Sequence, residues 1–412
     1  MVQVVLVIRV FNPKILFLMY KKSIHIGTLL CALFLFLNFS VQAQPIVTGA
    51  ERMHLYLPLL QGKNVAVVAN PTSIVTRANH SYIHLVDTLL SRGVKLVSIF
   101  CPEHGFRGQA EAGASINNEI DTRTQLPIVS LYGRNKKPSS QQLQDIDIVI
   151  FDLQDVGCRF YTYISTLHYV MEACAEQKIQ VIVLDRPNPN GHYVDGPVLD
   201  MQYKSFVGMH PVPIVYGMTI GEYAQMINGE YWLSDSLQCP LVVIPLQNYI
   251  HATHYSLPVA PSPNLQTSQA IALYPNLCLF EGTSISVGRG TLWPFEVVGS
   301  PYFKDKSFSF IPKPIKGVSE NPPCKDKQCY GLDLRKVTPP NQFSLAYLIT
   351  LYQGSVSRST FFLKSNFFEK LAGNGQLRSQ IQQGLSEKDI RATWQPKLDT
   401  FKQIRQRYLL YQ

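Results

Sequence analysis

One short stretch of the chain places an acid, an imidazole and a guanidinium next to one another. It reads CPEHGFRGQAEAG at residues 101–113 and directly follows the apolar run VKLVSIF. Runs rich in Val and Ile are typical of buried strands, so the polar residues begin where a strand is expected to end. Glu103 has the chemistry of a general acid, His104 could orient it through a hydrogen bond, and Arg107 supplies a positive charge. The glycines of this stretch allow the loop to bend closely around a ligand.

Two other apolar runs are also followed by polar and aromatic residues. The candidates in and after IDIVIFDL and IQVIVL are Asp152, Gln154, Asp155, Arg159, Tyr161, Tyr163, Asp185, Arg186, Asn188 and Asn190. The carboxyl ends of parallel strands meet at one edge of a sheet, where open α/β folds bind their ligands. We therefore expect these residues to gather with Glu103 around one crevice.

A fourth polar segment, LFEGTSISVGRGTLWPFE, lies in the second half of the chain and contains Glu281 and Arg289. The glycines on both sides of Arg289 resemble a backbone nest, which is a loop that binds anions. The simpler interpretation is a loop folded against the sheet. We favour a ligand-facing position for Arg289 and count Glu281 among the binding candidates.

Together these side chains suit a sugar better than a nucleotide. Carboxylates can protonate a leaving oxygen, tyrosines can stack on a ring, and arginines can pair with an acidic substituent. Neither G-x-x-x-x-G-K-[ST] nor G-x-G-x-x-G follows the first predicted strand, so phosphate binding is not indicated. Each residue alone also has a structural interpretation. Glu103 could cap a helix, Asp155 could shape a turn, and Arg159 could pair with a neighbouring aspartate.

The elements that would position these groups alternate along the first half of the chain. Apolar runs at 64–70, 94–100, 146–153 and 179–184 alternate with helical patterns at 81–93 and 160–177. Such runs between helices are typical of parallel strands buried on both faces. We predict an α/β fold with a doubly wound parallel sheet in residues 44–262. After the Pro-rich stretch YSLPVAPSPNLQT we expect a smaller α+β domain in residues 263–412.

Two helices can be anticipated in more detail. Thr219 and Glu222 have the spacing of a capping box, so a helix is expected to begin there. The last helical segment is amphipathic, and the apolar face consists of Leu398, Phe401, Ile404 and Tyr408.

The first 43 residues do not belong to the predicted fold. Lys21 and Lys22 precede an apolar segment from Ile24 to Phe39 and the small-residue ending VQA, which is the layout of a cleaved export signal. The alternative is an uncleaved membrane anchor, but the apolar run is short for a membrane span. We expect an exported chain, periplasmic or secreted, without stable membrane insertion.

Charge and cysteine content argue against two further classes of site. The formal net charge is +9, but four of the cations lie in residues 1–43, so the rest of the chain carries only +5. The absence of a Lys or Arg block gives nucleic-acid binding little support. Cys324 and Cys329 are spaced for a loop-closing disulfide, and metal-ligand partners do not accompany them. We predict neither a metal nor a cofactor.

Several motifs occur together in the order typical of one family. They are PEHGFRG, DLQDVGCRFYTY, LDRPNPNG, VDGPVL, APSPNL, FEGTSISVGRGT and the closing LAGNGQLRSQIQQGLSEKDIRATWQPKL. On these motifs the chain resembles the NamZ-type exo-β-N-acetylmuramidases from about residue 60 to its end. The resemblance implies a Rossmann-like domain, a smaller C-terminal domain and an active-site cleft between them.

The same resemblance implies an exported glycosidase. Such an enzyme removes N-acetylmuramic acid from the non-reducing end of peptidoglycan fragments such as N-acetylmuramic acid–N-acetylglucosamine. Glu103 matches the leading catalytic candidate of the family, and His104 completes its motif. Arg159 or Arg289 is suited to hold the lactyl carboxylate of muramic acid.

The second catalytic group stays open at this stage. Asp155 or Asp185 could orient water or act as the nucleophile, or the N-acetyl group of the substrate could attack instead. A non-catalytic protein that binds cell-wall glycans is the competing interpretation. A serine esterase is disfavoured because neither S-x-x-K nor G-x-S-x-G occurs in the chain.

Overall fold

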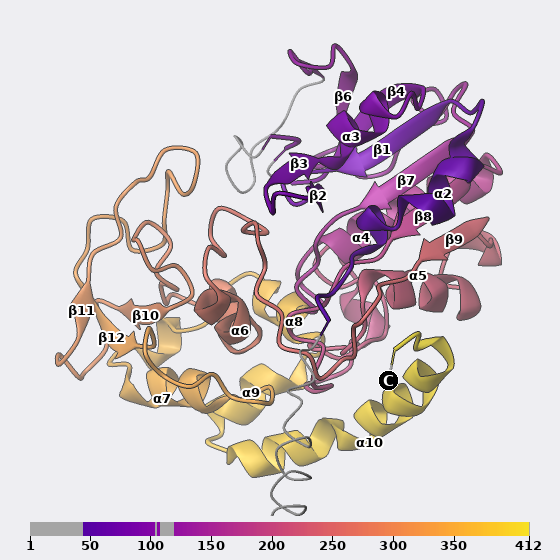
Figure 1. Cartoon of the computed structure of the whole chain (residues 1–412). Coiled ribbons are helices and arrows are strands. Elements are labelled where there is room, and N and C mark those ends of the chain that lie inside the picture. The colour runs from indigo at the N-terminus through magenta and orange to yellow at the C-terminus, as the bar shows by residue number, and fades with distance from the viewer. Residues whose placement is uncertain (1–43, 104, 108–118, 412) are drawn as a thin grey trace, which may run out of the picture. The chain divides into compact units, whose positions relative to one another are not determined.

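The computed structural model describes residues 44–103, 105–107 and 119–411, and from Ile46 onward the chain forms one compact unit (Figure 1). The predicted export signal at residues 1–43 and the candidate His104 lie outside the described residues. In the part of the chain that is described, no helix has both the length and the apolar character needed to span a membrane.

A seven-stranded sheet forms the centre of the first half of the chain. In spatial order its strands are β5 (Glu119–Ile120), β6 (Pro127–Ser130), β4 (Leu96–Cys101), β1 (Val65–Ala69), β7 (Ile148–Asp152), β8 (Gln180–Leu184) and β9 (Leu241–Ile244). β5 pairs antiparallel with β6, and the other pairs are parallel. Numbered along the chain, the parallel strands have the order 3-2-1-4-5-6, that of the doubly wound Rossmann fold. The predicted α/β class is confirmed, and Figure 1 shows the neighbouring strands β4, β1, β7 and β8.

The central strands are buried on both faces, which explains their near-continuous apolar sequences. In β7, Val149 and Phe151 belong to one hydrophobic cluster, whereas Ile148 and Ile150 belong to another. Successive side chains of a strand point to opposite faces, so the sheet separates the two clusters. The first cluster continues into the C-terminal helices as far as Phe401. One face of the sheet therefore shares its core with the second half of the chain.

Helices cover the sheet and make up much of the second half of the chain. They are α2 (Met53–Tyr56), α3 (Leu85–Ser91), α4 (Tyr163–Glu176), α5 (Ile220–Gly229), α6 (Ser268–Leu277), α7 (Ala346–Gly354), α8 (Phe367–Ala372), α9 (Gln376–Gln382) and α10 (Glu387–Arg405). α5 begins with the expected capping box of Thr219 and Glu222. α3 begins later than residue 81, because residues 82–84 form strand β3 (Tyr82–His84), which pairs with β2 (Ile74–Thr76). The imidazole of His84 then caps α3 by accepting from the N–H of Val86.

The second half of the chain contains a small antiparallel sheet together with helices. Its strands have the order β10 (Val297–Ser300), β12 (Cys329–Asp333) and β11 (Ser309–Phe310). β10 and β12 lie in the apolar stretches FEVVGSPYF and CYGLDLR, and α7 lies in FSLAYLITLYQGS. The expected mixture of helices and antiparallel strands is therefore present.

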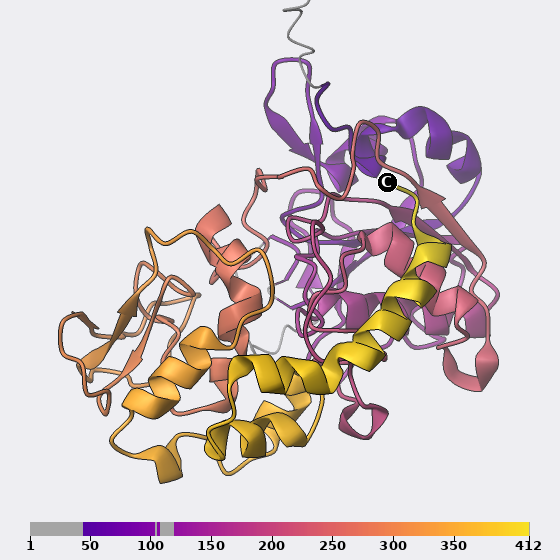
Figure 2. The same ribbon diagram turned by 90° about the horizontal axis from the view of Figure 1, so that it is seen from below.

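The long helix α10 links the C-terminal helices to the sheet region. Leu398 and Phe401 on its apolar face are buried, as the amphipathic pattern predicts. Arg391 pairs with Asp195 at 2.7 Å, and Tyr408, just beyond the helix, donates to Glu230 at the end of α5. Figure 2 shows α10 as the long yellow helix.

A fully buried ion pair joins the ends of β7 and β8. Arg186 donates to the two carboxylate oxygens of Asp152 at 2.6 and 2.9 Å and to the carbonyl of Ile74 at 3.1 Å. Burial lowers the pKa of Arg186, but the charge of Asp152 outweighs this effect and leaves the pKa raised. The pair thus fixes the edge of the sheet from which the candidate loops depart.

Replacing Asp152 by Asn should lower the free energy of unfolding by about 3–5 kcal/mol, because the charge of Arg186 would stay buried without a counter-ion. The exposed pair Asp333–Arg335 has the same two-pronged geometry, with distances of 2.8 and 2.7 Å. Asp333→Asn is therefore a matched control and should cost less than about 1 kcal/mol. Denaturant unfolding followed by circular dichroism measures both values. Equal losses in the two variants would contradict a special role for the buried pair.

Candidate active site

The candidate site lies where the strand order of the sheet reverses, between β1 and β7. In doubly wound folds ligands bind at the carboxyl ends of the strands at this point, because the adjoining connections leave toward opposite faces. The segments that follow β1, β4, β6 and β7 contribute Asn70, Glu103, Tyr132 and the pair Tyr161 and Tyr163.

Two tyrosines hold the Pro-rich loop against this edge of the sheet. The hydroxyls of Tyr161 and Tyr163 both donate to the carbonyl of Pro261, at 2.7 and 3.2 Å. The Asn70 amide donates to the hydroxyl of Tyr163 at 2.7 Å, and the two phenol rings meet edge to face at 4.8 Å. Burial raises the pKa of both tyrosines, so they remain neutral hydrogen-bonding groups. The loop and the sheet edge are thereby fixed relative to one another.

Glu103 lies two residues beyond β4, half-buried beside Tyr132. The Tyr132 hydroxyl hydrogen-bonds the Glu103 carboxyl. Burial, followed by the charge of Glu103, raises the pKa of Tyr132, so this phenol stays protonated and can donate to the carboxylate. Glu103 is therefore oriented by the residue that follows the adjacent strand.

Two adjoining cavities meet at Glu103. The more enclosed one, here called the inner lobe, has a volume of about 220 Å³, and the outer lobe has about 540 Å³. Glu103, Glu281 and Phe367 line both lobes. Aromatic side chains make up much of the rest of the inner lobe: Tyr132, Phe160, Tyr161, Tyr163, Phe206, Tyr274 and Phe295. The outer lobe is completed by Thr283, Ser284, Ile285, Val287, Pro323, Cys324 and Leu363.

An ion pair from the second half of the chain lines the inner lobe together with Glu103. Arg289 Nε donates to a Glu281 carboxylate oxygen at 2.6 Å, and the guanidinium lies 5.2 Å from the ring centre of Phe295. Burial lowers the pKa of Arg289, but the Glu281 charge outweighs it and leaves the pKa raised. Gly288 and Gly290, on either side of Arg289, have φ of 79° and 80°, a conformation that favours glycine. The predicted ligand-facing position of Arg289 agrees with this placement.

Asp155 is buried beside Tyr216 and does not line a lobe. Its carboxylate accepts from the Tyr216 hydroxyl and from the Gly157 N–H, and burial raises its pKa to about 6. The other carboxylate oxygen, Oδ1, is buried and has no hydrogen-bond donor among the described residues. The residues that line the two lobes do not include Asp155.

Asp185 is placed still more firmly in a structural role. It accepts from the Thr219 hydroxyl at 2.7 Å and the Gly221 N–H at 2.8 Å at the start of α5, and from the Tyr411 hydroxyl at 2.6 Å. Burial raises its pKa to about 7. Asp185 therefore caps a helix and anchors the C-terminal segment, and we no longer consider it as a catalytic candidate.

Four of the predicted binding residues are also internal. Asp152 and Arg186 form the buried pair described above, and Arg159 is fully buried with donors directed at backbone carbonyls. The Asn188 amide donates to the carbonyl of Met218 at 2.8 Å and accepts from the N–H of Asn190. Their hydrogen-bonding groups serve the loops that follow β7 and β8. The structure thus changes their interpretation from substrate contacts to supports of the site.

Arg107 lies beside the site, in a neighbouring cavity that Asn70 and Pro261 also line. Its guanidinium binds both oxygens of Asp121 at 3.1 and 2.8 Å. Among the described residues, no group of three His, Cys, Asp or Glu side chains could hold a metal ion.

Cys324 and Cys329 are free thiols in contact with one another. The hydrogen bond from Cys329 lowers the pKa of Cys324. Since Cys324 lines the outer lobe, a disulfide between the two residues would belong to the wall of the site. The disulfide stays a prediction.

Sequence reasoning missed several residues of the inner lobe. Tyr132 lies two residues after β6, so the rule that identified Glu103 could have found it. Tyr274, Phe295 and Phe367 lie in segments without a strand-end pattern, so only the tertiary structure brings them to the lobe.

Comparisons with known proteins agree with this architecture. The family model described as "Exo-beta-N-acetylmuramidase NamZ, N-terminal" matches residues 65–269, and the corresponding C-terminal model matches residues 272–411. The chain is 38% identical over 396 residues to a Bacillus subtilis (strain 168) protein named peptidoglycan beta-N-acetylmuramidase NamZ, covering 91% of this chain and 93% of that protein.

Two solved structures of DUF1343 family proteins from Bacteroides fragilis NCTC 9343 are also similar. One has a TM-score of 0.82 at 46% identity, and the match covers 90% of this chain and 99% of the chain in that structure. The other has a TM-score of 0.76 at 29% identity, and the match covers 89% of this chain and 99% of the chain in that structure. Both halves of the chain, with the segment after β4 that carries Glu103 and the loop that carries Arg289, lie within the matched ranges, and the chain belongs to the NamZ family of exo-β-N-acetylmuramidases.

Proposed function

We propose that this protein is a glycoside hydrolase that releases N-acetylmuramic acid from the non-reducing end of peptidoglycan fragments, with Glu103 as the general acid. The observation that carries the proposal is the position of Glu103 where the two lobes meet. A carboxyl group at such a junction can reach an oxygen that bridges two sugar units, one in each lobe. The family membership and the name of the Bacillus subtilis relative support the same reaction.

The unequal shapes of the lobes suit an enzyme that acts on chain ends. The terminal sugar enters the inner lobe, whose aromatic rings offer flat faces to a pyranose ring. The outer lobe is larger and accommodates the leaving glycan. N-acetylmuramic acid–N-acetylglucosamine is the smallest substrate that would fill both.

The chemical step moves one proton from Glu103 to the departing oxygen while the bond from that oxygen to the anomeric carbon breaks. Water then supplies the hydroxyl of the released sugar, and its remaining proton restores Glu103. Glu281 is the other carboxylate that lines both lobes, and it can stabilise positive charge at the anomeric carbon. The substrate's N-acetyl group could form the first bond instead, in which case Glu281 would only stabilise it.

Arg289 is suited to recognise the lactyl carboxylate of muramic acid. Among the described residues that line the lobes, it is the only lysine or arginine. Its Nε is bound to Glu281, and a guanidinium carries two further nitrogens that can donate to a second carboxylate. Arg159, the alternative considered from sequence, is internal.

The compartment is part of the proposal. The first 43 residues have the layout of an export signal, so we place the enzyme in the periplasm or outside the cell. Peptidoglycan fragments are available to an enzyme in either place.

Glu103→Gln should reduce release of muramic acid by at least about 100-fold, because the amide cannot supply the proton. Glu119→Gln is the matched control, since Glu119 is exposed and outside both lobes, and it should leave turnover unchanged. Turnover of a chromogenic muramic acid glycoside provides the measurement. Near-normal turnover by Glu103→Gln would refute the acid role, and no turnover by the unmodified protein would favour a glycan-binding protein.

Arg289→Met should weaken selection for muramic acid by about 10- to 100-fold, the usual worth of a hydrogen bond to a charged group. The ratio of kcat/KM values for muramic acid and glucosamine glycosides measures this selection. Arg335→Met removes a guanidinium from a surface ion pair and should not change the ratio. Equal losses on both glycosides in Arg289→Met would show that Arg289 has no role in recognising the carboxylate.

Asp155 should make the fold less stable as the pH rises. Its pKa is about 6 in the fold against 3.8 as an ordinary carboxyl, so the folded state holds the extra proton between these values. The stability is present below about pH 4 and is lost as the pH rises through 6, by about 3 kcal/mol for this shift.

Comparison with Asp155→Asn isolates this contribution, because the amide cannot ionise. The free energy of unfolding of the unmodified protein, minus that of the variant, should fall by about 3 kcal/mol between pH 4 and pH 8. For Asp333→Asn the same difference in the free energy of unfolding should rise between pH 4 and pH 8, because Arg335 lowers the pKa of Asp333. A difference for Asp155→Asn that does not vary with pH would contradict the expectation.

A further inference from the structure

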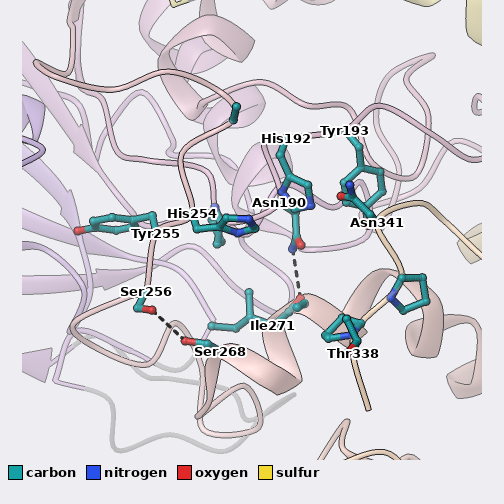
Figure 3. A pocket seen from close by; sticks show the side chains of 15 residues that line it. Asn190, His192, Tyr193, His254, Tyr255, Ser256, Ser268, Ile271, Thr338 and Asn341 are labelled. Atoms are coloured by element: carbon teal, nitrogen blue, oxygen red, sulfur yellow. Dashed lines mark hydrogen bonds between the residues drawn. The ribbon is translucent and has the colours of Figure 1, made fainter. Parts of the chain in front are cut away.

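A second cavity, separate from the two lobes, has a volume of about 570 Å³ (Figure 3). The residues that line it are not shared with either lobe. They come from four segments: residues 189–193 after β8, residues 252–256 at the start of and just before the Pro-rich loop, the first half of α6, and residues 338–341. Its size is typical of small-molecule sites.

The walls of this cavity combine flat surfaces with uncharged polar groups. The imidazole rings of His192 and His254 lie 5.4 Å apart, and Figure 3 shows both rings directed into the same space. Pro339 and Pro340 add apolar surface on the opposite loop. The polar groups besides the imidazoles include Asn341, Thr338, Ser256 and Ser268, of which the two serines hydrogen-bond each other at 3.4 Å, and Asn190, Tyr193 and Tyr255 also line the cavity.

Fixed charge is missing from the cavity walls. Among the described residues that line it, none is Asp, Glu, Lys or Arg. Burial, and then the charge of His254, lowers the pKa of His192, while a hydrogen bond from the imidazole to the Asn341 side chain opposes the shift. A neutral imidazole donates through one ring nitrogen and accepts through the other. An ionic ligand would lose its hydration here without gaining a counter-charge, so the cavity selects a neutral ligand with many hydroxyl or amide groups.

The wall on the side of α6 is firmly held. The Asn190 amide donates to the carbonyls of Val156 and Ile271 at 2.9 and 3.2 Å. Ile271 and Ala272 face this cavity, and Tyr274 on the same helix faces the inner lobe. The helix therefore forms a shared wall between the proposed catalytic lobe and this cavity.

We propose that this cavity is a second carbohydrate site, which binds a neutral N-acetylated sugar. Imidazole and proline faces contact the ring, Asn341 and the hydroxyls hydrogen-bond its polar groups, and Ile271 and Ala272 receive the acetyl methyl group. The identification of the sugar as the glucosamine unit of peptidoglycan rests on the proposed function. In a longer glycan the terminal acidic sugar occupies the inner lobe, which holds Arg289, and its neutral neighbour occupies the outer lobe, so the sugar that fits the cavity without fixed charge is a further neutral glucosamine unit.

The experiment is calorimetric titration of the protein with N,N′-diacetylchitobiose, a neutral disaccharide. Ala252→Trp fills the cavity from an exposed position and should abolish binding at this site. His254→Ala should weaken binding by about 10-fold through loss of a hydrogen bond and a ring face. His54→Ala, which removes an exposed imidazole from α2, is the matched control and should bind as the unmodified protein does.

The outcomes separate this proposal from that of catalysis. Glu103→Gln should bind the disaccharide normally, and Ala252→Trp should still hydrolyse a short muramic acid glycoside. Failure of the acid assignment for Glu103 would therefore leave the binding result unaffected. The proposal is overturned if the unmodified protein does not bind the disaccharide, or if Ala252→Trp binds it unchanged. It is also overturned if Arg289→Met, rather than Ala252→Trp, removes the binding.

Discussion

The buried guanidinium of Arg159 is the constraint on which the geometry of the site depends. It donates to the carbonyls of Pro197, Val212 and Leu371 at 2.7, 2.8 and 2.8 Å. Burial lowers its pKa to about 9, so the group is still charged at neutral pH. A charge buried without a carboxylate is tolerated only where dipoles surround it, and Leu371 lies at the C-terminal end of α8, where helix carbonyls carry partial negative charge. Gly373 completes the fit, because a Cβ there would lie 2.5 Å from the guanidinium.

The hydrogen bond from Arg159 to the carbonyl of Leu371 joins the two sides of the inner lobe, that of the sheet and that of α8. Tyr161 and Tyr163 lie two and four residues after Arg159, on the sheet side. On the other side, α8 begins with Phe367, which lines both lobes. α8 also packs closely on the turn that carries Glu281, since a Cβ on Gly282 would lie 2.5 Å from the Cα of Phe368. The position of Glu281 relative to the tyrosines is therefore set through Arg159 and α8.

The sequence predicted the parts of the site that follow from strand order. Glu103, Tyr161 and Tyr163 were found because polar groups after parallel strands converge at one edge, and the nest-like glycines on both sides of Arg289 identified that residue. The roles of Asp155 and Asp185 were beyond reach, because both have the same local pattern as Glu103. Their partners Tyr216 and Tyr411 lie 61 and 226 residues away along the chain. Whether a residue after a strand faces the cleft or the interior depends on such distant partners, and no local spacing encodes them.

In the proposed function, the exo mode of action depends on the Pro-rich loop that the two tyrosines hold in place, rather than on the catalytic acid. Glu103 could protonate any glycosidic oxygen brought to it. What limits access is the Pro-rich loop, which lines the inner lobe at Ser262 and Leu265. The loop is held there because two tyrosine hydroxyls donate to one carbonyl, that of Pro261, and proline restricts the backbone on either side. A wall held in this way resists widening, which favours a terminal sugar over a continuing chain in the inner lobe.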